Sequence, residues 1–254
     1  MKEKFIPGIY NYCDRWCERC TFTSRCRNYA HTSKLTPEQL DINNKAFWAT
    51  ISSNFEDAMR LLHKAAEKHG FDFNTPMSAE EEANYKKRES FLKTAAKQHP
   101  LSRLCKQYQN LVMPFVEKSE DFTEKTRELV SHLHLGITSE EDVVHTVADI
   151  GDCLEIIQWY LFFIDAKLQR ALHGKLESEE WETANSYQKD SDGSAKIALI
   201  AMERSTGAWV RLYSFLPSSE DTTLQALSLL EQLKQKTIEE FPDAMKFIRP
   251  GFDD

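Results

Sequence analysis

The sequence predicts an all-α protein, a bundle of six or seven helices that follows an irregular, cysteine-rich N-terminal segment. Apolar residues recur at helical spacing through most of the chain, and no stretch alternates between apolar and polar residues for long enough to form a half-buried strand. The 254 residues include only 8 glycines and 8 prolines, which is few for a β-rich or doubly wound chain. A hydrophobic content of 41% is sufficient for a packed core.

The predicted domain organisation has two parts, a metal-binding segment over residues 1–34 and a helical bundle domain over residues 35–254. Helical signals begin where Thr36 can act as an N-cap and Pro37 suits the first helical position. We expect this first helix to run to Lys68 and to stop near glycine 70. Its apolar stripe is formed by the following side chains: Phe55, Met59, Leu62 and Ala66.

Cap and breaker residues delimit the remaining helices. Ser78 with Glu81 three residues later is a capping box, and Gly174 is expected to end the longest helix. The polar stretch 187–195 is the clearest predicted loop, and Pro217 should break the chain again. The expected helices cover about 78–99, 101–115, 121–134, 139–172, 194–215 and 219–240. Within the longest one, residues 153–164 are apolar on nearly all sides, which predicts a central, buried helix.

Charge is distributed unevenly along the chain. The net charge is −8, but residues 1–34 hold seven basic and three acidic side chains, which leaves +4 there and −12 in the rest. An acidic body does not favour binding to nucleic acid or to an anionic membrane. The basic segment suits thiolate ligands that need compensating charge, and it equally suits an arm that docks on its own acidic body.

The opening residues have no secretory-type apolar core, and the most apolar run, residues 156–164, is far shorter than a membrane span. We therefore expect a cytoplasmic protein with no membrane partner. A reducing compartment disfavours disulfides.

The feature with the clearest chemical meaning is a cluster of four cysteines, Cys13, Cys17, Cys20 and Cys26, spaced C-x3-C-x2-C-x5-C. Thiols at this density in an intracellular chain indicate metal ligands. Structural zinc sites usually combine two C-x2-C knuckles that lie a dozen or more residues apart, whereas only Cys17 and Cys20 form a knuckle here. Ligands crowded into one loop favour an iron–sulfur cluster, with zinc as the alternative and disulfides or free thiols as the third possibility.

The first three cysteines of the cluster share the C-x3-C-x2-C spacing of radical-SAM enzymes. This resemblance covers eight residues, and it implies a strand-rich α/β barrel that the all-α pattern does not allow. We therefore do not adopt it.

The neighbours of the cluster suit a shielded anionic centre. Arginines can offset thiolate charge, aromatic rings can exclude water, and hydroxyl groups can donate hydrogen bonds to sulfur. These neighbours are Arg15, Arg19, Arg25, Arg27, Tyr12, Trp16, Phe22, Thr21, Thr23 and Ser24. The two remaining cysteines, Cys105 and Cys153, lie in apolar helical stretches and are expected to be small core residues.

A second metal or catalytic site is a weaker hypothesis. The paired Glu-x-x-His motifs of ferritin-like di-iron proteins are not found in the sequence. Acids and a histidine do lie beside apolar helical runs, where an unpaired charge would be costly. The candidates are Glu56, His63, Asp152, Glu155 and Glu203. Each of them is also explained as an ordinary boundary residue or as half of an ion pair, with Arg204 as one possible partner.

The sequence contains no phosphate-binding glycine loop, G-x-S-x-G elbow or H-E-x-x-H motif, so it identifies no catalytic residue and no reaction. The predicted function is that of a metal-binding helical protein whose four-cysteine centre, an iron–sulfur cluster, has a redox or sensory role. The alternative is an interaction protein with a structural zinc site. In either case the expected partner is another protein and not a nucleic acid.

Overall fold

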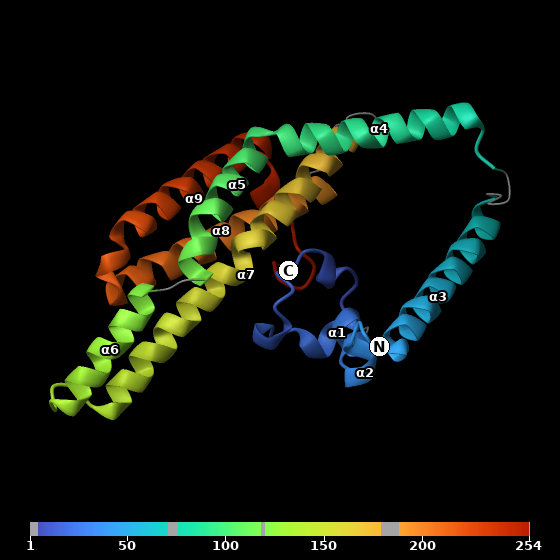
Figure 1. The fold of residues 1–254 in the computed structure, drawn as a ribbon. Coiled ribbons are helices and arrows are strands. Elements are labelled where there is room, and N and C mark those ends of the chain that lie inside the picture. The colour runs from blue at the N-terminus through green and yellow to red at the C-terminus, as the bar shows by residue number, and fades with distance from the viewer. Residues whose placement is uncertain (1–4, 71–75, 118–119, 179–187, 254) are drawn as a thin grey trace. The chain divides into compact units, whose positions relative to one another are not determined.

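The computed structural model describes residues 5–70, 76–117, 120–178 and 188–253 (Figure 1). All regular elements in these ranges are helices, which confirms the all-α prediction. The chain divides into two compact units, which are described separately: unit 1 comprises Met1–Asn11 and Arg15–Ser90, and unit 2 comprises Tyr12–Asp14 and Phe91–Asp254. The predicted functional boundary at residue 34 stays a prediction.

Unit 1 begins with short turns and continues into two long helices. Its elements are η1 (Ile9–Asn11), η2 (Cys17–Arg19), η3 (Thr23–Arg25), α1 (Arg27–Thr32), α2 (Pro37–Leu40), α3 (Lys45–His69) and the first part of α4 (Ala79–Gln98). The predicted capping box opens α4, where the Ser78 N–H donates to Glu81 at 2.8 Å and the Glu81 N–H donates to the Ser78 hydroxyl at 3.2 Å. Gly70 ends α3 with a φ of 72°, as predicted.

The prediction of one helix from Thr36 to Lys68 was wrong, because the chain breaks between α2 and α3. The carboxylate of Asp41 accepts a hydrogen bond from the Asn43 N–H at 2.9 Å. The side chain of Asn44 then caps α3 by accepting from the Ala46 N–H at 3.0 Å. These short polar side chains offer the backbone local partners that compete with a continuous helix.

Unit 2 is a bundle in which α5 (Pro100–Glu117) packs on α7 (Glu140–Ser178) and α9 (Glu220–Glu240), and α8 (Asp190–Phe215) packs on the same two helices (Figure 1). The other elements are α6 (Glu120–His134), η4 (Pro217–Ser219) and η5 (Ala244–Lys246). The core is apolar with a few buried hydrogen bonds, such as that from the Trp209 indole to the Tyr108 hydroxyl at 3.0 Å.

The predicted burial of the middle of α7 holds for one face only. Buried positions on this helix include Ile157, Tyr160 and Ile164, whereas Trp159 and Phe162 are exposed. The prediction that the middle of α7 is buried on nearly all sides was therefore too broad, because apolar side chains also lie on its exposed face.

Two predicted boundaries in unit 2 were wrong. Gly174 does not end α7, which continues to Ser178. In this extra turn, the ammonium of Lys175 donates to the Glu240 carboxylate at 2.7 Å and to the Glu240 carbonyl at 2.9 Å. The predicted loop 187–195 is helical from residue 190 onward, and residue 187 lies outside the described residues. Residues 191–199 are buried, so tertiary packing overrides their polar composition.

Within the described residues, no helix combines the length and the apolar character needed to cross a membrane.

Candidate metal centre

Three of the four clustered cysteines, Cys17, Cys20 and Cys26, lie in unit 1 on a series of tight turns. Cys17 opens η2, and the Cys20 N–H closes that turn on the Cys17 carbonyl at 3.2 Å. The N–H of Phe22 donates to the sulfur of Cys20 at 3.4 Å. Hydrogen bonds to sulfur are among the contacts that tune iron–sulfur centres. The local geometry of Cys20 is therefore compatible with a role as a metal ligand.

The sulfur of Cys26 also has a backbone donor. Cys26 is the N-cap of α1, and its sulfur accepts from the Tyr29 N–H at 3.5 Å. The segment before it is held to the start of the described chain, because the Ile6 N–H donates to the Arg25 carbonyl at 3.0 Å. Two of the three thiols in unit 1 are therefore placed by hydrogen bonds of the turns themselves.

Aromatic residues of the segment hold its arginines. The guanidinium of Arg19 lies 3.9 Å from the centre of the Trp16 ring, and that of Arg27 lies 5.8 Å from the centre of the Phe5 ring. Trp16 is buried. Cation–π contacts of this kind fix positive charge beside an apolar ring. The basic character predicted for this segment is thus built into its packing.

Cys13, the remaining member of the cluster, belongs to unit 2 and lies between two anchored residues. On one side, the Asp14 carboxylate accepts hydrogen bonds from the Tyr160 hydroxyl at 2.9 Å and from Arg204. The Arg204 guanidinium also donates to the Tyr160 hydroxyl at 2.7 Å. The indole of Trp159 donates to the Asp14 carbonyl at 3.1 Å. Side chains of α7 and α8 therefore bind both the carboxylate and the backbone of Asp14.

Tyr12, on the other side of Cys13, is anchored just as firmly. Its hydroxyl donates to Asp190 at 2.9 Å, and Arg170 donates to the same carboxylate. Its ring centre lies 4.6 Å from that of Phe247. Burial, followed by the hydrogen bond to Asp190, raises the pKa of Tyr12 to about 12. The phenol therefore stays protonated and keeps its donor role at physiological pH.

Sequence reasoning missed this anchoring network. Its members Tyr160, Asp190 and Arg204 lie on helices far along the chain, and each has an ordinary role in its own helix. The proximity of Tyr12 and Asp14 to Cys13 was the only signal, and it did not identify their partners. Arg204 was considered as a partner for a helical acid, but the structure pairs it with Asp14.

All four clustered cysteines are partly exposed, and none of them forms a disulfide. Within the part of the chain that the structure describes, no three or more His, Cys, Asp or Glu side chains group closely enough to hold a metal ion. The described residues therefore show partly exposed cysteines with local backbone donors to two of the sulfurs, and no assembled coordination sphere. That these four cysteines are the metal ligands stays a prediction from their spacing in the sequence.

The two other cysteines have a structural role, as expected. Cys105 and Cys153 are buried in the core of unit 2. Burial raises the pKa of both thiols. Neutral, buried thiols are poor nucleophiles and poor metal ligands.

The weaker second set of candidates is spread over three helices. Glu56 and His63 are exposed on α3 in unit 1, whereas the other three candidates lie in unit 2. Glu203 on α8 forms an ion pair with Lys234 on α9 at 3.1 Å. Asp152 is partly exposed and Glu155 is exposed on α7, so the expected penalty for a buried acid does not arise at Glu155. Their catalytic use remains an untested hypothesis.

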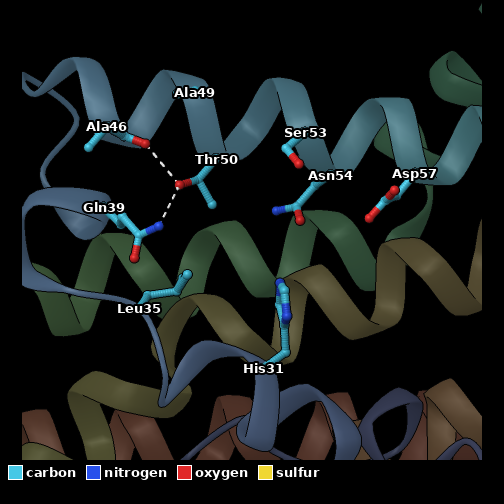
Figure 2. Close-up of a pocket in the computed structure, with 9 residues that line it drawn as sticks. All are labelled: His31, Leu35, Gln39, Ala46, Ala49, Thr50, Ser53, Asn54 and Asp57. Atoms are coloured by element: carbon cyan, nitrogen blue, oxygen red, sulfur yellow. Dashed lines mark hydrogen bonds between the residues drawn. The ribbon is translucent and has the colours of Figure 1, made fainter.

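Unit 1 also contains a pocket of about 480 Å³ between α3 and the residues around α1 and α2 (Figure 2). Figure 2 shows His31 directed toward the face of α3 that carries Ser53 and Asn54. The amide of Gln39 donates to the Thr50 hydroxyl at 3.1 Å across it. None of the predicted metal ligands lines this pocket.

No known protein family, curated protein or solved structure matches this chain.

Proposed function

We propose that the N-terminal segment binds one iron–sulfur cluster through Cys13, Cys17, Cys20 and Cys26, and that this centre has a redox or sensory role. The observation that supports the proposal is the presence of four partly exposed cysteines within fourteen residues, none of which forms a disulfide. Buried structural cysteines are inert, whereas these four retain access to solvent and so to a metal.

The spacing favours a cluster over a single metal ion. A chain that wraps a polynuclear cluster can supply its thiolates from one loop, while a zinc tetrahedron is usually closed by two separate knuckles. Backbone N–H groups directed at sulfur are among the contacts that tune cluster potential, and Cys20 and Cys26 each accept one. When bound, the cluster would supply one-electron chemistry or a redox-dependent change of charge.

The residues around the thiols have defined supporting roles in this proposal. Trp16 and Arg19 together place a buried ring and a cation beside the Cys17–Cys20 knuckle. Asp14 and Tyr12 hold the backbone on both sides of Cys13. The segment thus combines positive charge with a backbone that is already fixed at Cys13. A fixed backbone lowers the entropy cost of ordering this ligand when metal binds.

The proposal is tested by purifying the full chain under anaerobic conditions and measuring iron, acid-labile sulfide, zinc and visible absorption. We expect iron and sulfide in comparable amounts and a broad absorption band that bleaches on reduction with dithionite. Stoichiometric zinc in a colourless protein would exclude the redox function and favour the alternative. A chain with neither metal would contradict both.

The alternative is an interaction protein in which zinc only orders the N-terminal segment. The C-x2-C knuckle of Cys17 and Cys20, with the Phe22 N–H bonded to sulfur, is the observation that favours it. Chelation should then increase hydrogen exchange in residues 5–34 and abolish binding to a protein partner. Under both hypotheses the protein acts in the cytoplasm with a protein partner, and not on nucleic acid or a membrane.

A further inference from the structure

The two faces of α3 have opposite character. The face toward α1 and α2 is small and polar, and Figure 2 shows Ala46, Thr50 and Ser53 along it. At about 100° per residue, the opposite face has a stripe of large apolar side chains. This α3 stripe consists of Trp48, Ile51, Phe55, Met59 and Leu62, which are 57, 37, 70, 48 and 47% exposed, respectively. A contiguous apolar face of this length indicates an interaction surface.

The spacing of the α3 stripe is symmetric about Phe55. Counted from that residue, the large side chains lie at −7, −4, +4 and +7, and two small residues, Ser52 and Ala58, lie at −3 and +3. Reversing the direction of the helix leaves this pattern unchanged. A heptad repeat would instead place the large residue at +3. The stripe therefore complements a second copy of itself in the antiparallel orientation.

Charge at the ends of the α3 stripe is complementary in the same arrangement. Lys45 and Glu67 lie on one flank of α3, ten residues before and twelve residues after Phe55. In an antiparallel pair, Lys45 of one copy lies within reach of Glu67 of the other, and two-fold symmetry repeats the contact. Glu56, beside the centre, faces its own counterpart. The pairing thus has two attractive contacts at its ends and a repulsive one in the middle.

From these features we infer that the chain forms a two-fold symmetric dimer through antiparallel packing of α3, with Phe55 on the two-fold axis. In a symmetric dimer one patch serves both protomers, so Trp48 contacts Leu62 of the second copy and Ile51 contacts Met59. Small residues at −3 and +3 allow the helices to approach closely. The inference does not depend on the metal centre.

The first test is the molar mass of the full chain by light scattering and sedimentation equilibrium, which should give twice the 29.5 kDa chain mass. Phe55→Glu places two like charges on the axis and should raise the dimer dissociation constant at least about tenfold. Phe91→Glu is the matched control, because Phe91 on α4 is 67% exposed; it should leave the dimer intact. Glu56→Gln removes the central repulsion and should tighten the dimer about twofold.

The second test leaves the centre of the α3 stripe unchanged and reports orientation. Trp48 is replaced by the photo-crosslinking residue p-benzoylphenylalanine in a mixture of ¹⁵N-labelled and unlabelled chains. Crosslinks between chains should map to the tryptic peptide 61–64, which contains Leu62. The inference would be overturned by a monomeric wild type or by a dimer insensitive to Phe55→Glu. It would equally be overturned by crosslinks to residues 46–52 of the second chain, which indicate parallel packing, or by crosslinks only within one chain.

Discussion

Asp14, one residue after the first clustered cysteine, forms an ion pair with Arg204 on α8, although 190 residues separate them in the sequence. Tyr160 donates to the same carboxylate at 2.9 Å. The peptide Tyr12–Asp14 thereby belongs to the packed body of unit 2. If Cys13 is a metal ligand, its backbone is already fixed before any metal binds.

The first prediction concerns the strength of this ion pair. Arg204→Ala removes this cation from the Asp14 carboxylate, whose side chain is only 19% exposed. We expect the free energy of unfolding to fall by about 1–3 kcal/mol. Urea unfolding followed by circular dichroism provides the measurement.

Arg211→Ala is the matched control for that variant. Arg211 lies on the same helix, has the same 52% side-chain exposure as Arg204 and pairs with Asp149 at 2.8 Å, but this aspartate is 38% exposed. An exposed ion pair contributes less than about 1 kcal/mol. Equal losses in the two variants would show that the Asp14 contact has no special role in stability.

The second prediction concerns Gly193 at the start of α8. A Cβ atom at this position would lie 2.5 Å from Cε1 of Tyr12 and 2.7 Å from Cζ of Phe247. Gly193→Ala should therefore displace these rings and lower the free energy of unfolding by about 1–3 kcal/mol.

Gly207→Ala, further along α8, is the control because nothing lies within 4 Å of the added atom. Alanine has the higher helix propensity, so this variant should gain about 0.5–1 kcal/mol. Thermal unfolding of the two variants should thus shift in opposite directions. A stabilised Gly193→Ala protein would contradict the close packing of Tyr12 on α8.

The third prediction concerns pH dependence near the C-terminus. The buried Lys196 ammonium donates to the Phe247 carbonyl at 2.6 Å and pairs with Asp253 at 2.8 Å. Although burial opposes it, hydrogen bonds from Arg249 and Lys196 lower the pKa of Asp253 below its ordinary value. A depressed carboxyl pKa stabilises the fold above the unfolded pKa of about 3.9, and this contribution is lost as pH falls below it.

Asp253→Asn should therefore lower the free energy of unfolding by about 1–3 kcal/mol near neutral pH. The difference from wild type should shrink as pH falls below about 4, because the carboxyl of the unfolded chain takes up a proton there while the folded Asp253 stays ionised, and it should vanish only as pH falls through the lower pKa of the folded state. Asp243→Asn is the control, since Asp243 pairs with the exposed Lys246 at 2.8 Å. A difference that is constant from about pH 6 to 3 would contradict an ionised, bonded Asp253.

The parts of the fold that the sequence predicts well are those encoded by adjacent residues. The capping box of Ser78 and Glu81 and the left-handed Gly70 are local signals. The start of α4 and the end of α3 accordingly lie where predicted. The break between α2 and α3 is also local, because Asp41 and Asn44 bond to nearby N–H groups. It was missed because the apolar periodicity on either side was given more weight than these side chains.

The remaining errors come from contacts that are distant in sequence. The polar start of α8 resembles a loop, yet it is helical and buried, with the rings of Tyr12 and Phe247 close to Gly193. Glu203 resembles a buried functional acid, yet it pairs with Lys234 from another helix. The same limit applies to the candidate centre, where spacing selects the thiols but nothing local identifies the partners of Asp14.

The central claim is that the clustered cysteines, and not the buried ones, bind the metal. Its most direct test is iron, sulfide and zinc content per chain after anaerobic purification of the wild type, Cys17→Ser, Cys20→Ser and Cys153→Ala. We predict one metal centre per chain in the wild type and in Cys153→Ala, and loss of it in both serine variants. A wild-type chain without stoichiometric metal, or equal metal content in all four proteins, would contradict the proposed centre.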